Sequence, residues 1–486
     1  MKKYNPARNC SCDTDNCSSN KSQSKNGKKM LGVNTACPSG FPEFSPAEER
    51  VRQTWMRVIR EVFEQNGFLP IETPLVEREE NLVAKGGNPK EIYVLKRLHD
   101  DDDKSHSGNA VRFDHTVPLA LYVARHFNEL AFPFRRYVIG PVMRGERAQK
   151  GRFRQFDQCD IDVIGMEHLS LLNDALMPAI IIQIFEKLQI GDFKVRINNR
   201  KLLVGIAKTV GVDENEFIRI LDEQEKVGKE KSIERMKELR SGGNTSINPD
   251  ALEKWMEFRR NIGEIDKEAN DGNFKSYFLK LKELKGIDPV YDQGVQELEQ
   301  VFEALSSMGV DKKKYRPDIN IARGLDYYTG TVFETVLLDN RISGSICAGG
   351  RYDDLAEIFT GKKLPGVGIS IGLTRLLSQL FEAKILQPDR SSPTEVLVIA
   401  TEDKYISQSL ELATEIRGMG FATENYLEGK KLDKQFSYAD KLGIPACVVL
   451  GENEVKNGTV QVKDMRKKKQ EEVKAKDLES ALKKVL

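Results

Sequence analysis

Apolar and polar residues alternate along residues 155–164, which read QFDQCDIDVI. Successive side chains of a β-strand point to opposite faces of the sheet. The alternation therefore predicts a strand with one mostly polar face and one apolar face. The polar face carries Phe156, Gln158, Asp160 and Asp162, and the apolar face carries Cys159, Ile161 and Val163.

A second strand is predicted just upstream, within residues 135–144, and a basic loop joins the two. Pro141 argues against a regular central strand, because proline cannot donate to a ladder. Carboxylates, an amide and arginines on one sheet face would suit a ligand with an anionic group and an amine. A hairpin with one solvated face is the alternative. The arginines and other charged residues here are Arg144, Glu146, Arg147, Lys150, Arg152 and Arg154.

Helical periodicity begins at Ser45, where Ser45, Pro46 and Glu48 form a capping box with proline at the first helical position. Apolar residues then recur at helical spacing as far as Gly67, a typical helix end. Phe68–Val76 is predicted to be extended, and its two prolines place it at an edge or an interface.

Residues 111–127 predict a short strand, a turn and then a helix from about Pro118. Asp114 and Thr116 lie at the strand end, where binding sites often form. The alternative for Thr116 is that its hydroxyl caps the helix.

Longer helical patterns follow. Residues 169–188 predict an apolar helix, kinked or interrupted at Pro178, and residues 193–198 predict a strand. From about Lys201 to Tyr315 the composition becomes rich in Lys and Glu at helical spacing. This change predicts a separate helical insertion.

Ile319–Leu338 predicts a hairpin, because two apolar strands flank Tyr-Thr-Gly-Thr. Arg323 shares strand parity with Ile319 and Ile321, so it would face an otherwise apolar surface. A charge is costly there unless it is paired. We therefore expect Arg323 to be functional.

Glycines mark two later segments. Ser343–Asp354 has three glycines, which a backbone lying close to a ligand would need. Pro365–Leu377 is a glycine-spaced strand that runs into a helix, with Arg375 about one turn inside it. Neither segment matches a P-loop or a dinucleotide-binding fingerprint.

Beyond Pro393 buried strands alternate with helices, which predicts a small α/β domain with a mixed sheet. Basic residues gather in part of this domain, and two interpretations stay open: a surface for single-stranded RNA, or a solvated face. These residues are Lys430, Lys431, Lys434, Lys441, Lys463, Arg466, Lys467, Lys468 and Lys469.

Composition narrows the classes of protein. The 486 residues suffice for about three domains, and 39% apolar with 31% charged residues is typical of a soluble globular protein. A net charge of +1 means that any nucleic-acid binding must come from local patches. No apolar run approaches the ~20 residues of a membrane helix, and no secretory signal is expected at the start.

The seven cysteines show no regular pairing, which favours a reducing, cytoplasmic setting. The spacing of Cys10, Cys12 and Cys17 is a weak match to known zinc sites. No role follows for them or for Cys37. Residues 1–41 are rich in Ser, Asn, Lys and Gly and predict a disordered basic tail.

Several motifs, in this order, resemble those of the histidyl-tRNA synthetases, a family of class IIa aminoacyl-tRNA synthetases. GFLPIETPLVE is similar to class II motif 1, a dimer-interface element. GPVMRGERAQKGRFRQFDQCDIDV is similar to motif 2 and GVGISIGLTRLL to motif 3, while RGLDYYTGTVFE and AGGRYDDL resemble the two histidine-specific motifs. RFDHTVP resembles the family's RYDLTVP, with His115 in place of leucine, a position expected to act mainly through its backbone.

The resemblance implies the α/β (α+β) fold of class II synthetases: an antiparallel sheet flanked by helices, a helical insertion and a C-terminal α/β anticodon-binding domain. The catalytic domain would be residues 42–393 with the insertion at about 201–315, and the anticodon-binding domain residues 394–486. The implied activity is that of a histidine–tRNA ligase. The alternatives are a non-catalytic paralogue that regulates ATP phosphoribosyltransferase in histidine biosynthesis, and an RNA-binding or signalling protein on an inactive core.

The resemblance also implies residue roles. Arg144 and Arg323 would be catalytic, Arg144 on the α-phosphate of ATP and Arg323 between that phosphate and the substrate carboxylate. The ATP-binding set would be Arg144, Glu146, Arg152 and Arg375. The histidine-binding set would be Asp114, Thr116 and Gln158 for the amino group, with Asp162, Tyr327 and Tyr328 for the imidazole. Implied partners are L-histidine, ATP with Mg²⁺, tRNA(His) and a second copy of the chain.

Overall fold

The computed structural model describes residues 35–84, 89–97, 108–149, 151–227, 231, 234–235, 248–321, 328–353 and 357–486. The predicted tail up to residue 34, residues 98–107, Lys150, Arg323 and Tyr327 lie outside these ranges. The chain divides into two compact units. We call Arg57–Ile385, with the stretch that ends at Pro42, the first unit, and Glu43–Met56 with Leu386–Leu486 the second unit.

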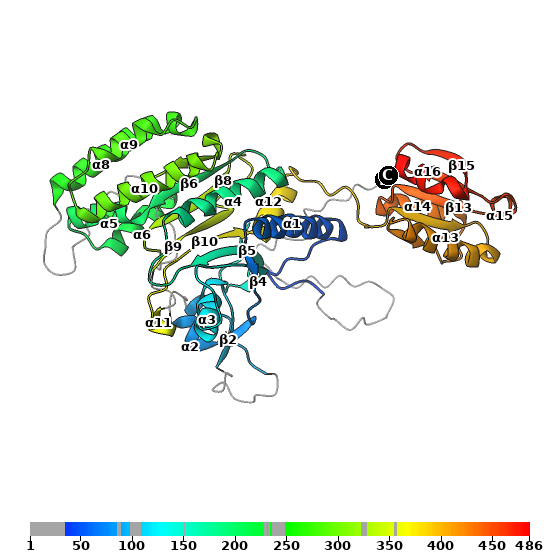
Figure 1. Cartoon of the computed structure of the whole chain (residues 1–486), viewed down its shortest axis with the longest axis horizontal. Helices are drawn as coiled ribbons and strands as arrows, with labels where there is room; N and C mark the ends of the chain where they lie inside the picture. Colours follow the sequence, from blue (N-terminus) through cyan, green and yellow to red (C-terminus); the bar gives the residue numbers. More distant parts are fainter. Residues whose placement is uncertain are drawn as a thin grey trace, which may run out of the picture. The chain divides into compact units, whose positions relative to one another are not determined.

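An eight-stranded sheet forms the centre of the first unit, in the order β1-β4-β5-β10-β9-β8-β6-β7 (Figure 1). Among its described strands only the pairs β1–β4 and β6–β7 are parallel. The predicted antiparallel sheet is therefore confirmed. The strands are β1 (Leu69–Pro70), β4 (Phe134–Met143), β5 (Gln155–Ile164), β6 (Phe193–Asn199), β7 (Tyr315–Pro317), β8 (Thr331–Leu337), β9 (Cys347–Tyr352) and β10 (Gly366–Gly372).

Helices cover the apolar face of this sheet. They are α1 (Pro46–Gln65), whose second half belongs to the first unit, α4 (Leu172–Leu188), α10 (Pro289–Ser307) and α12 (Leu373–Glu382). The apolar residues of β5 are fully buried beneath them, as the alternation predicted. Polar contacts fix the helices on the sheet: Tyr137 to Glu64, Asp157 to Thr374, Asn199 to Glu297 and Arg351 to Asp174.

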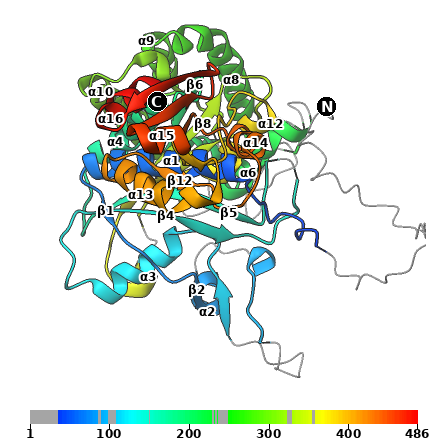
Figure 2. The ribbon, with the colours of Figure 1, turned by 90° about the vertical axis from the view of Figure 1, so that its right-hand side faces the viewer.

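A smaller group of elements lies beside β4 in both ribbon views (Figures 1 and 2). It consists of β2 (Val76–Arg78), α2 (Glu79–Val83), β3 (Asn109–Val111) and α3 (Thr116–His126), with the short helical turn η2 (Pro89–Glu91). Leu82, Phe113 and Val117 pack together in its core. This packing places the end of β3 and the start of α3 against the polar face of the sheet.

The helical patterns after β6 form α5 (Arg200–Val210), α6 (Glu214–Val227), α8 (Pro249–Asn270) and α9 (Lys275–Lys282), followed by α10 and the turn η3 (Lys312–Lys314). Helices α5 and α10 approach closely at Gly205, where a Cβ atom would lie 2.6 Å from the Cβ of Tyr291. The short helix α11 (Glu357–Thr360) follows β9.

Helix starts and interruptions test the local predictions. The capping box at α1 is confirmed, since the Ser45 backbone N–H and hydroxyl donate to Glu48 at 2.8 and 2.6 Å. Helix α4 runs through Pro178 without interruption. Helix α3 starts at Thr116, earlier than predicted, and capping by the Thr116 hydroxyl is wrong: Asp114 accepts the Val117 N–H at 3.1 Å instead.

One strand prediction is met and another is wrong. Strand β4 is regular through Pro141, but β1 pairs only with Arg136 and Tyr137, so among the described strands β5 alone pairs with β4 at Pro141, the edge position that proline tolerates. The hairpin predicted over residues 319–338 fails in its described part. Ile319 and Asn320 form a turn after β7, and β6 lies between β7 and β8.

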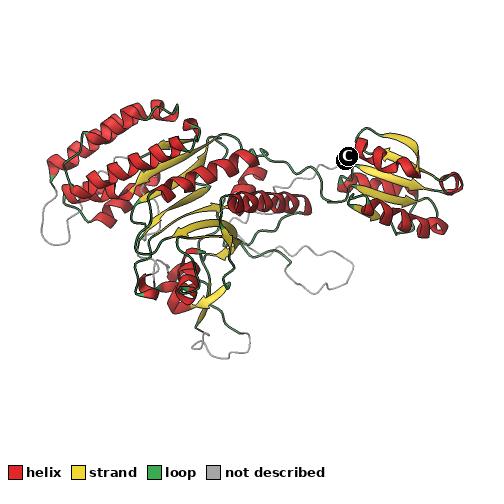
Figure 3. Ribbon diagram, viewed as in Figure 1, coloured by secondary structure: helices red, strands yellow, loops and turns green. Residues whose placement is uncertain are grey.

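The second unit contains a five-stranded mixed sheet, in the order β12-β11-β13-β14-β15, with helices on both faces (Figure 3). The predicted α/β domain is confirmed. Its strands are β11 (Val396–Ala400), β12 (Thr423–Asn425), β13 (Ala446–Leu450), β14 (Thr459–Asp464) and β15 (Lys469–Lys474). Its helices are α13 (Ile406–Gly418), α14 (Leu432–Leu442), α15 (Glu452–Asn457) and α16 (Leu478–Val485), with the turns η4 (Asp403–Tyr405) and η5 (Ala475–Asp477).

Membrane insertion finds no support in the helices. Within the described ranges, none is both long enough and apolar enough to span a bilayer.

Candidate active site

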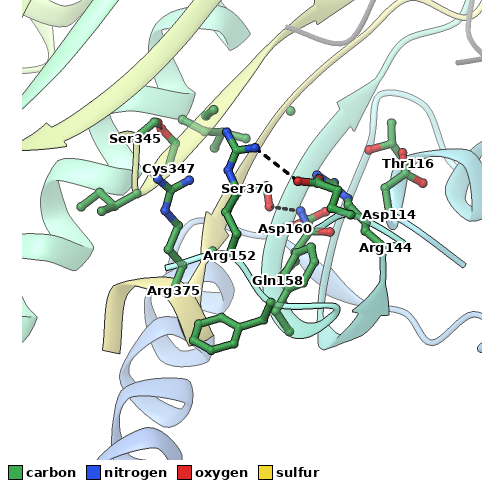
Figure 4. A pocket seen from close by; sticks show the side chains of 18 of the residues that line it. Asp114, Thr116, Arg144, Arg152, Gln158, Asp160, Ser345, Cys347, Ser370 and Arg375 are labelled. Carbon is green, nitrogen blue, oxygen red and sulfur yellow. Dashed lines mark hydrogen bonds and ion pairs between the residues drawn. The ribbon is translucent and has the colours of Figure 1, made fainter. Parts of the chain in front are cut away.

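A cavity of about 360 Å³ lies over the polar face of β5, β10 and β9 (Figure 4). It brings together every predicted site residue that the structure describes. Arg323 and Tyr327 lie outside the described residues. The predicted residues that line the cavity are Asp114, Thr116, Arg144, Glu146, Arg152, Gln158, Asp162, Tyr328 and Arg375.

Asp162 is a buried part of the cavity wall. Its Oδ2 lies 2.6 Å from Nη2 of the fully buried Arg136, and its Oδ1 accepts the Tyr352 hydroxyl at 2.7 Å. Only glycine fits opposite it on β10, since a Cβ at Gly368 would lie 2.0 Å from Asp162 Oδ1. Burial raises the pKa of Asp162, and the charge of Arg136 opposes that rise.

Two further carboxyl groups, Asp114 and Asp160, are buried in the same cavity. Burial raises the pKa of Asp114 to about 6 and that of Asp160 to about 7. The backbone N–H of Val117 and the charges of Arg144 and Arg136 hold the Asp114 value down. The three carboxyl groups of Asp114, Asp160 and Asp162 lie close together in one wall. Because a nearby positive charge favours their ionised form, this wall should attract a cationic group of a ligand.

Ser370 of β10 connects the polar side chains of β5. The Nε2 of Gln158 donates to Ser370 Oγ at 2.9 Å, as the dashed line in Figure 4 shows. Ser370 is in register with Asp160 and hydrogen-bonds its carboxyl group. Ser370 therefore orients both the Gln158 amide and the Asp160 carboxyl group.

Guanidinium groups line the more open side. Arg144 donates through Nε to the Phe113 carbonyl at 3.0 Å, and its guanidinium lies 5.3 Å from the Phe156 ring centroid. The Glu146 carboxylate lies 4.0 Å from Arg144 and 3.5 Å from Arg152. These contacts hold positive charge at the mouth of a cavity whose inner wall is acidic.

Arg375 enters the cavity from the third residue of α12, and its Nη2 donates to the Ser343 carbonyl at 3.3 Å. Gly344, with φ of +74°, leaves room for this guanidinium, since a Cβ there would lie 2.5 Å from Nη2. Arginines around one cavity suit a polyphosphate, while buried carboxyls suit an amine. The cavity can therefore hold a polyphosphate and an amine-bearing ligand at the same time, which a phosphoryl-transfer reaction between them requires.

Several residues in or behind the cavity wall escaped prediction as site residues: Asp160, Tyr352 and Ser370 line the cavity, and Arg136 lies behind Asp162. Arg136 was visible in the sequence, but its pairing depends on the register of β4 with β5, which sets it opposite Asp162. Asp160 shares the alternation that identified Gln158 and Asp162, so that signal could have found it.

Two glycine assignments need correction. A Cβ at Gly349 would lie 2.2 Å from the Gly368 carbonyl, and one at Gly350 would lie 2.7 Å from the Thr331 carbonyl. Neither glycine lines the cavity. They permit close packing between strands, so the prediction that they admit a ligand is wrong for this pair.

His115 differs from the family pattern and is fully enclosed. Its Nε2 lies 3.1 Å from the Gly140 carbonyl, and its own carbonyl accepts from Arg136 Nη2 at 3.3 Å. Burial, with Arg112 and Arg136 nearby, lowers the pKa of His115 to about 3. The imidazole is therefore a neutral support behind Arg136.

Within the described residues no group of three or more His, Cys, Asp or Glu side chains could hold a metal ion. Cys10, Cys12 and Cys17 lie outside those residues, and the Cys37 side chain is exposed.

Comparison with known proteins adds independent findings. The model of the family Histidyl-tRNA synthetase matches residues 40–376, and that of the Anticodon binding domain matches residues 395–485. A histidine–tRNA ligase from Trichormus variabilis is 44% identical over 471 residues, which are 93% of this chain and 98% of that protein. One from Clostridium tetani is 44% identical over 447 residues, 91% of this chain and 96% of the relative.

Solved structures agree. A histidyl-tRNA synthetase from a Nostoc species aligns with a TM-score of 0.79 at 41% identity, covering 93% of this chain and all of that one. A Bacillus halodurans protein described as an ATP phosphoribosyltransferase regulatory subunit/histidyl-tRNA synthetase aligns with a TM-score of 0.66. It is 20% identical over 86% of this chain and 99% of its own, so this second likeness concerns the fold alone.

Proposed function

The chain belongs to the histidyl-tRNA synthetase family, and we propose that the cavity over β5 is where it joins L-histidine to ATP. The protein is a histidine–tRNA ligase: histidine is activated with ATP to histidyl-adenylate, and the histidyl group passes to the 3′ end of tRNA(His). One observation carries the assignment of the site. Arginines that follow β4 or lie in α12, and buried carboxyls from β5 and from the turn between β3 and α3, line a single cavity.

The arginines would bind ATP. Arg144 lies next to the acidic wall, so it would contact the α-phosphate, where the histidine carboxylate attacks. Arg152 and Arg375 would hold the distal phosphates. Phosphoryl transfer depends mainly on positioning and charge neutralisation, and both follow from guanidinium groups that the protein already holds by backbone contacts.

Mg²⁺ would enter with the nucleotide. The oxygen donors it prefers are scarce on the arginine side, where Glu146 is the carboxylate among the cavity-lining residues. The ion would therefore be held mostly by phosphate oxygens, with Glu146 beside them, and it would neutralise phosphate charge.

The acidic wall would bind histidine. Asp114, Thr116 and Gln158 would hold the α-amino group, while Asp162 and Tyr328 would hydrogen-bond the imidazole nitrogens. Arg323 and Tyr327 receive their roles from the family motif RGLDYY alone: Arg323 between carboxylate and α-phosphate, and Tyr327 near the ring. A site built to hydrogen-bond both ring nitrogens rejects apolar analogues by about 10⁴-fold.

Domain roles complete the proposal. Residues 42–393, with the insertion at about 201–315, would form the catalytic domain, and residues 394–486 would bind the anticodon region of tRNA(His). A homodimer through the motif 1 segment and a cytoplasmic location are further parts of the proposal. The regulatory paralogue is less well supported, because the arginine set lines the cavity and the anticodon-binding match is present.

Histidine-dependent ATP–pyrophosphate exchange, followed by charging of a tRNA(His) transcript, tests the proposal. We expect exchange with histidine and background levels with other amino acids. Exchange at background with histidine too, in a correctly folded preparation, would favour the regulatory alternative.

A further inference from the structure

Three buried oxygens in the cavity wall have no hydrogen-bond partner within the described part of the chain. They are Oδ2 of Asp114, Oε1 of Gln158 and Oδ1 of Asp160. Asp160 is 4% exposed, and it is the member of this group that carries no assigned role. A buried acceptor without a donor is destabilising, so three of them in one cavity point to a ligand that supplies donors.

The protein holds the opposite end of each of these side chains. Asp114 accepts the Val117 N–H through Oδ1. Gln158 donates through Nε2 to Ser370, and Ser370 hydrogen-bonds the Asp160 carboxyl group. Each free oxygen is therefore oriented by a contact behind it. Figure 4 shows the three side chains as neighbours in the cavity, with Asp114 on one side and Asp160 and Gln158 on the other.

The chemistry of the three acceptors selects one kind of donor group. A primary ammonium carries three N–H donors and no acceptor. It also brings the positive charge that two buried carboxyls need. Asp162 is less available for this purpose, because Arg136 and Tyr352 already contact its two oxygens.

We propose that Asp160 is a histidine-binding residue that, with Asp114 and Gln158, completes a three-oxygen cradle for the α-ammonium group of the substrate. This inference rests on the proposed function of the cavity. It adds a contact to the amino-group set of Asp114, Thr116 and Gln158 and makes Asp160 a determinant of specificity for amino acids over their deaminated analogues.

Binding of the histidine ammonium should then release a proton from Asp160. Burial raises the pKa of Asp160 to about 7, with Arg136 lowering it and Asp162 and Asp114 raising it. The buried Cys347 thiol also faces this carboxyl, and burial keeps its pKa well above the ordinary range, so it stays neutral. At pH 6.5, below this pKa, most empty sites hold a proton on Asp160. When the ammonium arrives, the carboxyl O–H releases that proton to solvent, and the carboxylate accepts an ammonium N–H.

The test compares two ligands and two variants. Histidine KM in pyrophosphate exchange is measured beside the inhibition constant of imidazolepropionate, which keeps the ring and the carboxylate but lacks the amine. Asp160→Asn should raise the histidine KM about 10- to 100-fold, as expected for losing a charge-assisted hydrogen bond, and leave the imidazolepropionate constant unchanged. Asp389→Asn makes the same chemical change on a carboxylate that is 82% exposed and should alter neither.

Calorimetry in two buffers of different ionisation enthalpy counts the protons. At pH 6.5 the native protein should release more protons per histidine bound than Asp160→Asn does. Ser370→Ala removes the hydroxyl that orients Asp160. It should raise the histidine KM by a smaller factor and again leave the imidazolepropionate constant unchanged. This variant replaces Asp160→Asn in the test if Asp160→Asn is poorly folded.

Equal histidine KM values for Asp160→Asn and Asp389→Asn would overturn the proposal. So would an equal loss of affinity for histidine and imidazolepropionate, because the carboxyl would then act on the ring or on the shape of the site. Absence of histidine-dependent exchange in the native protein is a different result, since it would refute the function proposed for the cavity.

Discussion

The two sheets of this protein use buried strands in opposite ways. In the second unit Val396 and Val398 pack into one core and Leu397 and Ile399 into another, so β11 is apolar on both faces. In the first unit β5 is apolar on one face only. Its other face carries Gln158, Asp160 and Asp162, all buried and polar.

The difference separates stability from binding. Side chains on both faces of β11 contribute hydrophobic burial, at about 25 cal/mol per Å² of apolar surface. The polar face of β5 instead keeps carboxyl groups whose ionised form is disfavoured in the empty protein. We infer that the first sheet gives up stability at its polar face and recovers it when a cationic ligand binds.

The largest expected effect comes from breaking the buried ion pair behind the cavity. Arg136→Met leaves Asp162 without its cation, and such losses typically cost about 3–5 kcal/mol. Urea denaturation of the ligand-free protein measures this loss. The double variant Arg136→Met with Asp162→Asn should regain much of the stability, since no unpaired charge remains. Native-like stability in the single variant would show that Arg136 does not support Asp162.

Removing a guanidinium from the open side should affect chemistry rather than folding. Arg375→Ala is expected to lower histidine-dependent pyrophosphate exchange about 10²- to 10³-fold, as for the loss of a preorganised donor, with little change in melting temperature because the side chain is only half-buried. Arg341→Ala is the control, because Arg341 pairs with Asp339 outside the cavity. Equal exchange in the two variants would exclude Arg375 from the ATP site.

Shortening a buried side chain in the sheet of the second unit should lower stability and leave pyrophosphate exchange intact. Ile399→Ala leaves a cavity in an apolar core and should destabilise the second unit by about 2–4 kcal/mol. Hydrogen exchange of β11 and β13 peptides should accelerate, while pyrophosphate exchange is retained. Ile161→Ala is the matched change under β5 and should weaken both. Loss of pyrophosphate exchange with Ile399→Ala would contradict the inference that β11 contributes to stability and β5 to binding.

The smallest effect concerns pH. The pKa values of Asp114 and Asp160, about 6 and about 7 in the folded protein, lie above the ordinary 3.8. Their contribution to stability is therefore complete below about pH 4 and is lost as pH rises through 6 and 7. Hydrogen exchange of β5, corrected for the intrinsic rate, should show weaker protection at pH 8 than at pH 5.5, and Asp160→Asn should reduce the difference. Protection that strengthens with pH would contradict the burial argument.

Local pattern was enough to predict much of this molecule. Alternation identified both faces of β5, and the capping box at Ser45 and Pro46 identified the start of α1. These predictions hold because side-chain periodicity and capping act over a few residues. The residues that share one cavity were selected by the resemblance of the motifs to a known family and not by periodicity.

Other features depend on contacts distant in sequence. Arg136 meets Asp162 only through the register of β4 with β5. The predicted hairpin failed because β6 lies between β7 and β8, which no local pattern encodes. The alternative of a Thr116 cap at α3 fails because Asp114 accepts the N–H instead; both are good capping residues, and only the backbone path decides between them.

A crystal structure of the protein with L-histidine and a non-hydrolysable ATP analogue tests the central claim most directly. We expect the histidine ammonium within about 2.7–3.2 Å of Asp114, Gln158 and Asp160, and the triphosphate between Arg144 and Arg375. Histidine bound elsewhere, or an ammonium turned away from these oxygens, would contradict the assignment of the polar face of β5 as the amino-acid site.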